Sequence, residues 1–389
     1  MKIWKGLFVA ALLMLTAACG GGGGGSKSTT VTGVAAAGVI KGGTVKVFAP
    51  YSSATGADKK QLGATATTDA NTGVYSVNIG SYTGPVIVEV FGNYTDEATN
   101  QTATIPSTAP LRAMAVTTAG KVDVAVTPLT ELAARQAITL SGGAGKKVTA
   151  ANIDTANAQI SDLFKVNDII ATQPLDASAP LSGSADQKNY TLVLAALSQV
   201  GNDPTKLATT LDTVAAGINS AGVMTDPVAT SITDALDAFV APTNTNNKTG
   251  ITTATLPGEL ADIGATTVTL TMVLTGTGVK SVQTDITLPA NVSVETDNTG
   301  AFAAGVLTNL IGGTNVSLVG SELTASSVRV IFNRADATPM PAGDIATVKF
   351  LVAPGVAAPA ATAFTTANTM LKDANGVVVT GANLALVKR

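Results

Sequence analysis

The sequence predicts a multidomain β + α + β chain with a small N-terminal β-sandwich, a central helical bundle and a C-terminal jelly-roll β-sandwich. Three observations support this fold class. At 389 residues, the chain is longer than a single hydrophobic core usually accommodates. Short segments rich in Val, Ile and Thr occupy both ends of the chain, as expected of strands. Between them, apolar residues recur at helical spacing.

The composition excludes most kinds of catalytic and metal site. The chain contains no histidine and a single cysteine, Cys19. It therefore cannot form a Ser-His-Asp triad, a Cys-His dyad, an imidazole metal site or an intrachain disulfide. Only 13% of the residues are charged and the formal net charge is −3, which argues against nucleic acid as a partner. We therefore expect a protein that is not an enzyme and has no cofactor or metal.

Residues 1–18 have the pattern of a secretory signal peptide. Two lysines precede an apolar run over residues 7–15, which is too short to span a bilayer. Small residues then lead to Cys19. This arrangement resembles the lipobox of bacterial lipoproteins, although Leu15 lies four residues before the cysteine and Thr16 stands where leucine is more usual.

The lipobox resemblance implies that Cys19 becomes the lipidated N-terminus and holds the protein on a lipid bilayer. Residues 19–30 then form a tether, since six consecutive glycines, Gly20 to Gly25, give the flexibility that an anchored domain needs. Gly20 directly after the cysteine favours the outer membrane, with the protein on the cell surface or the periplasmic face. The alternative is a secreted protein cut elsewhere, with Cys19 as a free thiol.

Residues 31–126 are predicted to form the first β region. The strand candidates are residues 44–48, 74–79, 86–91 and 122–126. A turn over residues 68–73 precedes the second of them, because its Asp and Asn favour local hydrogen bonds and its Gly favours positive φ. The order VTG, GTVKVFA, TDANTGVYSVNI and GPVIVEVFG resembles the carboxypeptidase regulatory-like domain, a small prealbumin-type sandwich. That resemblance implies a spacer or binding module without catalysis.

Residues 127–241 are predicted to be helical. Thr127 is a suitable N-cap and Pro128 a suitable first helical residue. Four further helices are expected at residues 151–164, 188–200, 204–221 and 227–240. Their polar faces carry Thr, Asp, Asn and Gln, so packing against one another is favoured over lying on a membrane. Residues 242–255 then read as a polar linker.

Residues 256–389 are predicted to form the second β region. Seven strand candidates are joined by turns, at residues 266–274, 279–288, 316–319, 327–332, 344–352, 377–379 and 384–387. In the first of these, Thr largely alternates with apolar residues, which indicates one buried and one solvated face.

Three segments of this region resemble the cohesin family: VQTDITLPANVSV at 282–294, GDIATVKFLVAPG at 343–355 and KDANGVVVTGANLALV at 372–387. The resemblance implies a cohesin-like jelly-roll sandwich related to carbohydrate-binding modules. It also implies a protein partner, since cohesins bind dockerins, which are calcium-loaded helical modules, through one flat sheet face. Either of the two outer sheet faces could be the one that binds the partner.

Carboxylates in the loops could have a metal-binding or catalytic role, or a structural one. Asp373 and Asn375 could hold part of a calcium site, but we expect an ordinary Asx turn. The pairs Asp96-Glu97 and Asp297-Asn298 are expected to be exposed loop residues without a catalytic role.

The sequence therefore favours a non-enzymatic, membrane-anchored surface lipoprotein that presents its cohesin-like domain to an extracellular protein partner. The alternative is a polysaccharide-binding or matrix adhesin. That alternative lacks a strip of planar rings, because Trp4 is the only tryptophan and all five tyrosines precede residue 191. A hydrolase of surface polymers is the least favoured of the three hypotheses.

Overall fold

The computed structural model describes residues 28–389, apart from residues 51–58, 145, 298, 314 and 337. The predicted signal peptide, Cys19 and the glycine run lie outside the described residues. Within the described part of the chain, no helix is both long enough and apolar enough to cross a membrane.

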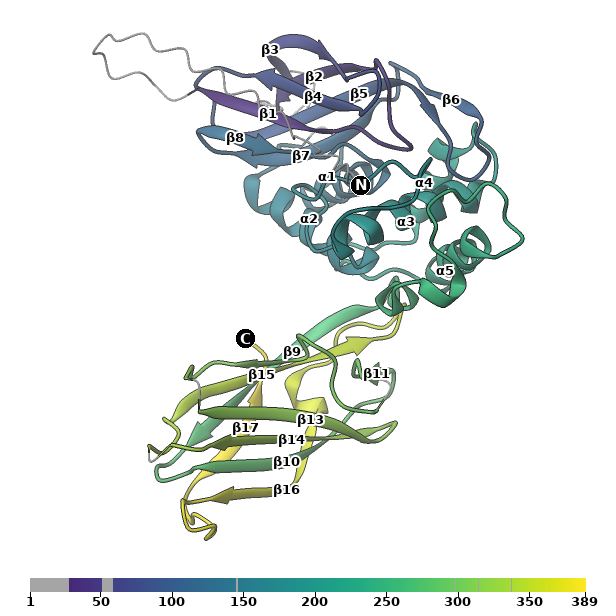
Figure 1. Ribbon diagram of the computed structural model, residues 1–389. Coiled ribbons are helices and arrows are strands. Elements are labelled where there is room, and N and C mark those ends of the chain that lie inside the picture. The colour runs from purple at the N-terminus through teal and green to yellow at the C-terminus, as the bar shows by residue number, and fades with distance from the viewer. Residues whose placement is uncertain (1–27, 51–58, 145, 298, 314, 337) are drawn as a thin grey trace, which may run out of the picture.

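Two facing sheets begin the chain (Figure 1). One has the order β4-β1-β8, and in the other β3-β2-β5 continues to β6, with β7 also paired to β5. Valines from both sheets, such as Val31 of β1, Val45 of β2 and Val88 of β5, are fully buried between the sheets. The strands are β1 (Thr29–Val34), β2 (Thr44–Ala49), β3 (Lys60–Thr67), β4 (Val74–Asn78), β5 (Gly84–Thr95), β6 (Thr102–Ile105), β7 (Leu111–Thr117) and β8 (Gly120–Asp123).

The four strand candidates of this region overlap β2, β4, β5 and β8. Strands β1, β3, β6 and β7 were not expected. The last candidate is shifted, because β8 ends at Asp123 and only Val126 of the following residues forms a bridge, to Ala35. A Cβ on Gly33 would lie 1.9 Å from the carbonyl oxygen of Val124, so β1 and this segment approach more closely than any other residue type allows.

Five helices follow, as the sequence predicts: α1 (Pro128–Leu140), α2 (Ala150–Phe164), α3 (Ala185–Gly201), α4 (Leu207–Ala216) and α5 (Asp226–Val240). The predicted cap of α1 is confirmed, since the Thr127 hydroxyl accepts a hydrogen bond from the Thr130 amide at 3.3 Å. Helix α4 is shorter than predicted. Asp203 instead closes a turn by accepting hydrogen bonds from Thr205, and the chain turns back after Gly217.

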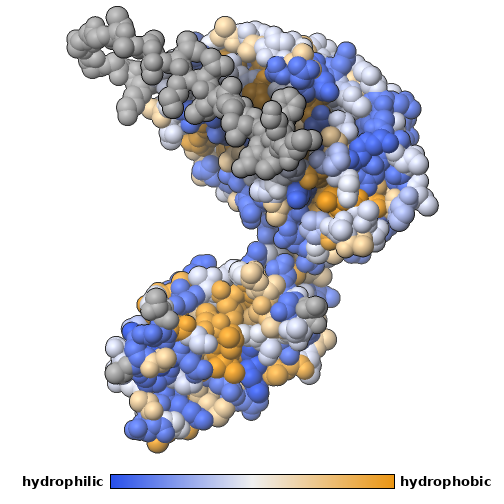
Figure 2. All heavy atoms as spheres, in the orientation of Figure 1, coloured by the Kyte–Doolittle hydropathy of each residue, from blue (hydrophilic) through white to orange (hydrophobic). Residues whose placement is uncertain are grey.

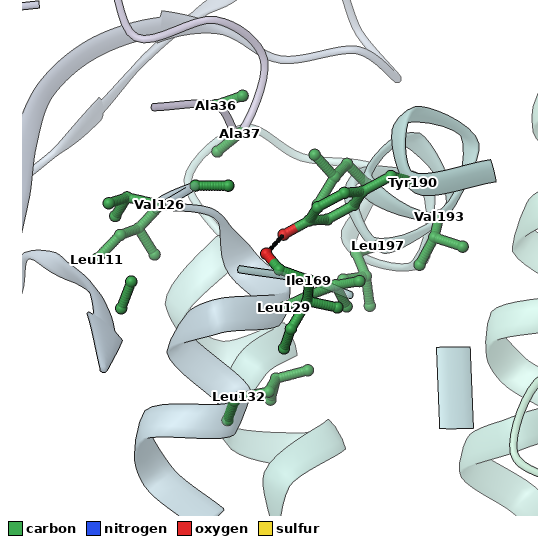
Figure 3. Close-up of a cluster of buried hydrophobic side chains, with 14 of the residues drawn as sticks. Ala36, Ala37, Leu111, Val126, Leu129, Leu132, Ile169, Tyr190, Val193 and Leu197 are labelled. Atoms are coloured by element: carbon green, nitrogen blue, oxygen red, sulfur yellow. Dashed lines mark hydrogen bonds between the residues drawn. The ribbon is translucent and has the colours of Figure 1, made fainter. Parts of the chain in front are cut away.

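The helices pack directly on the second sheet. Phe48, Ile87 and Met114, on the sheet face away from the first sheet, pack against residues of α1 and α2 such as Ala134 and Ile153. A second, larger core continues from between the sheets into the helices. In Figure 3, Tyr190 of α3 lies among Ala36, Ala37, Val126 and Leu129, and its hydroxyl donates to the Ile169 carbonyl at 2.9 Å.

The sandwich and the helices, which the sequence separates, therefore share one hydrophobic core and form an N-terminal unit, residues 28–263. The predicted linker belongs to this unit. The Asn246 amide donates to the Ala98 carbonyl at 2.7 Å, and Leu260 and Ile263 beyond it are buried in the shared core.

The C-terminal unit, residues 264–389, is a separate sandwich with its own core. Its sheets have the orders β13-β14-β10-β16 and β11-β15-β9-β17, with β12 on β15. The strands are β9 (Thr266–Thr275), β10 (Ser281–Thr287), β11 (Val292–Ser293), β12 (Leu307–Asn309), β13 (Val316–Thr324), β14 (Ser327–Arg334), β15 (Gly343–Val352), β16 (Thr365–Lys372) and β17 (Asn383–Val387).

Six of the seven strand candidates are confirmed here. The prediction of a strand at residues 377–379 is wrong, since only Val378 pairs there, in an isolated bridge to Lys372, and Val377 and Val378 are 60% and 59% exposed. Strand β16 was not expected, because TTANTMLK lacks the alternation of a half-buried strand and six of its eight residues are exposed.

The two units are joined at residues 264–267 (Figure 1). The Gly264 amide donates to the Leu163 carbonyl at 2.8 Å, and the Thr267 amide to Asp162 Oδ2 at 3.2 Å. Lys165 Nζ donates to the Ala265 carbonyl at 2.6 Å, and burial lowers the pKa of this lysine. The end of α2 thus holds the connection by several hydrogen bonds.

Candidate functional site

The outer face of sheet β13-β14-β10-β16 is the candidate site. Val328, Val330 and Phe332 of β14 are fully buried between the sheets. Because successive side chains of a strand point to opposite faces, Arg329 and Ile331 point outward. The same reasoning applies to β10, where Val282 and Ile286 are buried.

Strand register aligns the outward residues into rows across the sheet. The central row is apolar apart from one amide, and consists of Val319, Ile331, Gln283 and Met370 from four different strands. Val319 is 52% exposed and Met370 is 36% exposed. A polar row lies on each side: Ser321, Arg329, Asp285 and Ala367 on one, and Ser317, Asn333, Ser281 and Lys372 on the other. Figure 2 shows hydrophobic residues gathered on this unit over β13 and β14.

An ion pair borders the apolar row. Arg329 Nε donates to Asp285 Oδ1 at 2.6 Å and Nη2 to Oδ2 at 2.9 Å, which is bidentate geometry. A β-bulge in β16 places Asn368 at a φ of 48°, from where its amide also donates to Asp285, at 2.8 Å. These donors, Arg329 first, hold the pKa of Asp285 below its usual value. The charges at this edge are thus fixed and mutually neutralised.

The outer face of the opposite sheet has a different character. On β9, Val268, Leu270, Met272 and Leu274 are buried, and Thr269, Thr271 and Val273 alternate with them toward the outer face, where Thr269 is exposed but Thr271 is covered by the neighbouring strands. The outward residues paired with them on β15 include Thr347 and Lys349. This face therefore offers hydroxyls and a lysine where the first face offers a row of aliphatic side chains.

The predictions for the loop carboxylates are confirmed for Asp373 and Asp297. Asp373 Oδ1 accepts hydrogen bonds from the amides of Asn375 at 2.8 Å and Val377 at 2.9 Å, which confirms the Asx turn. Asp297 is exposed, as predicted, and caps Thr299 and Ala301, whereas Asn298 lies outside the described residues. Among the described residues, no group of three or more His, Cys, Asp or Glu could hold a metal ion.

The prediction for Asp96 and Glu97 is wrong, since they are only 3% and 8% exposed. Asp96 Oδ1 accepts from the amide and the hydroxyl of Thr99, at 3.0 and 2.8 Å. Glu97 lies between the sheets and α3, where burial raises its pKa to about 7 although Gly38 and Ser198 donate hydrogen bonds to it. The sequence gives no signal of this burial, because the loop becomes buried only when the helices fold onto it.

Neither a protein-family model nor a curated protein sequence matches the chain. Several solved structures resemble part of it, and two of them are cohesins. One is the type II cohesin A11 from Bacteroides cellulosolvens, with 20% identity over 29% of this chain and 81% of that one, at a TM-score of 0.24. The other is a type II cohesin domain from the cellulosome of Acetivibrio cellulolyticus, with 15% identity over 32% of this chain and 86% of that one, at a TM-score of 0.24. The strand pairing of this chain itself shows the two-sheet sandwich of the C-terminal unit.

Proposed function

We propose that this protein is a lipid-anchored, non-enzymatic surface lipoprotein that binds an extracellular protein partner through the outer face of β13-β14-β10-β16. The observation that carries the proposal is the row of Val319, Ile331 and Met370, of which Val319 and Met370 are exposed, between two rows of mostly polar residues. Aliphatic side chains flanked by polar ones are typical of a protein-binding surface. The sequence resemblance to cohesins over residues 282–294, 343–355 and 372–387 points in the same direction.

The size of the face suits a helical partner. Its four strands have seven to nine residues. At about 3.3 Å per residue and about 4.8 Å between strands, the face measures roughly 25 Å by 14 Å. An α-helix with its side chains is about 10 Å wide, so one or two helices fit along the apolar row. A dockerin-like helical module is the partner we propose.

The anchored arrangement is also part of the proposal. Cys19, lipidated after removal of residues 1–18, would hold the chain at the outer membrane, and the N-terminal unit would stand between the tether and the binding face. The polysaccharide alternative receives no support from this face, because its outward side chains are aliphatic, polar or charged and include no ring to stack on a sugar.

Affinity capture tests the proposal. The bait is the chain from residue 19 onward with Cys19→Ser, incubated with solubilised outer membrane and secreted protein, with calcium in one sample and a chelator in another. We expect one specific protein to be retained and to be lost with the chelator, as for a calcium-loaded helical module. Ile331→Asp on the apolar row should weaken its binding by about tenfold or more, because a carboxylate would be buried against the partner.

The matched control is Thr269→Asp, which places the same carboxylate on the outer face of the opposite sheet, where Thr269 is exposed. Equal loss of binding in both variants, or retention of polysaccharide without protein, would contradict the assigned face. Calorimetric unfolding of both variants confirms that the sandwich remains folded.

A further inference from the structure

The N-terminal unit contains a cavity of about 850 Å³ that the proposed function does not use. It lies between the end of the second sheet and α4, and its lining residues all belong to the N-terminal unit. Its volume lies in the range typical of small-molecule sites. The walls come from β6 and β7, from the loop between them, and from α1 and α4.

One part of the cavity is apolar. Ile105 and Leu111 line it from the sheet side, and Leu207 and Leu211 line it from α4. The connecting loop supplies Pro106 and Pro110 at its two ends, and the Ala109 amide donates to the Pro106 carbonyl at 3.0 Å. Two prolines and a closed turn restrict this loop, so the wall is formed before any ligand arrives.

The other part carries a cluster of charges built around Glu131, whose side chain is only 4% exposed. Arg112 Nε and Nη2 donate to its two oxygens at 2.9 and 2.7 Å, and Arg135 Nε donates to Oε1 at 2.8 Å. The buried carboxylate therefore fixes the position of both guanidinium groups.

Arg135 is the cation that we place against a ligand, since Lys59, which also lines the cavity, is paired with Glu89. Its outer contact is to Asp212, at 2.7 Å from Nη1, and the Asp212 side chain is 71% exposed. An ion pair with so exposed a partner contributes little, so an anion in the cavity can replace it at small cost. Arg135 lines the cavity, whereas Asp212 does not.

From this arrangement we propose that the cavity binds a small amphipathic carboxylate, with its apolar body against Leu111, Leu207 and Leu211 and its carboxylate on the guanidinium of Arg135. The apolar part of the wall favours a ligand with an apolar body, and a pre-positioned guanidinium on a side chain that is 28% exposed favours a carboxylate over a neutral headgroup. The site is independent of the partner-binding face, because it lies in the other unit and shares no residue with it.

Calorimetric titration with decanoate tests the proposal, with decan-1-ol as the uncharged ligand of equal chain length. The protein is the chain from residue 19 onward with Cys19→Ser. We expect one decanoate site per chain and affinity for decan-1-ol lower by about tenfold or more, since a hydrogen-bonded charge pair is lost. Arg135→Gln should reduce decanoate affinity to the level of decan-1-ol and leave decan-1-ol binding unchanged.

Two further variants keep the test decisive. Ala208→Trp, at an exposed cavity-lining residue of α4, fills the space without disturbing the core and should weaken both ligands. Arg389→Gln makes the same change as Arg135→Gln at an arginine in the other unit and should have no effect. The absence of decanoate binding, or equal decanoate affinity in Arg135→Gln and the unsubstituted protein, would overturn the proposal. Ile331→Asp should leave decanoate binding intact, which separates this site from the proposed partner face.

Discussion

Glu97→Gln provides the sharpest test of the burial seen in the N-terminal unit. Burial raises the pKa of the Glu97 carboxyl from its ordinary value of 4.5 to about 7. A carboxyl with a raised pKa binds its proton more tightly in the folded than in the unfolded protein. Its contribution is therefore most favourable below the unfolded pKa, and stability is lost as the pH rises toward the folded pKa. Above that value the loss is complete.

The expected magnitude follows from the two pKa values. At about 1.4 kcal/mol per pKa unit, ionising Glu97 costs on the order of 3 kcal/mol in total, and most of this falls between about pH 5 and pH 8. The amide in Glu97→Gln can still accept from the Gly38 amide and donate to the Ser198 hydroxyl, so the local packing is kept. Between about pH 5 and pH 8, the free energy of unfolding of Glu97→Gln should therefore fall by roughly 2–3 kcal/mol less than that of the unsubstituted protein.

Urea unfolding followed by near-ultraviolet circular dichroism of tyrosine is the assay. All five tyrosines lie between residues 51 and 190, so this signal reports on the N-terminal unit alone. Glu322→Gln, an exposed glutamate of β13 in the other unit, is the control and should behave as the unsubstituted protein does. Parallel pH profiles for Glu97→Gln and the unsubstituted protein would refute the assignment of Glu97 as a buried, proton-binding carboxyl.

Two further predictions concern the same unit and use the same tyrosine signal or far-ultraviolet circular dichroism. Tyr190→Phe should lower the free energy of unfolding by about 1–3 kcal/mol, because the buried Ile169 carbonyl loses its donor; an unchanged stability would contradict this. Gly33→Ala should cost about 3 kcal/mol, because the new methyl group meets the Val124 carbonyl and the backbone must move. Gly258→Ala, where no atom lies within 4 Å of the added Cβ, is the control and should be nearly neutral.

The sequence predicted elements well where the signal was local. The N-cap at Thr127 and the periodicity of residues 151–164 depend only on neighbouring residues, and both agree with the structure. Strand β16 was missed for a physical reason. Its first five residues, TTANT, are small or polar, so no alternation marks its buried side.

The predicted linker shows the limit of local composition. Asn and Thr are common in solvated linkers because they hydrogen-bond to nearby backbone. The same property lets them satisfy an irregular backbone that is held against the protein: Asn247 Oδ1 accepts from Thr249, and the Thr249 carbonyl accepts from the Leu181 amide at 2.9 Å. Composition alone does not distinguish the two cases.

The proposed binding face could not be predicted from the sequence, for a related reason. Val319, Ile331 and Met370 are scattered along the chain, and each is an ordinary apolar residue in its own segment. Only the register of three strand pairs brings them into one row. The sequence could identify two sheets with one solvated face each, but it could not show which face carries aliphatic side chains.

The shared core implies that the first sandwich and the helices of the N-terminal unit cannot fold as separate domains. Phe48, Ile87 and Met114 lie on a sheet face that α1 and α2 cover, so residues 31–126 would expose a hydrophobic surface if they stood alone. The helices are therefore part of the same folded body as the first sandwich, and the hydrogen bonds from the end of α2 to residues 264–267 connect that body to the second sandwich.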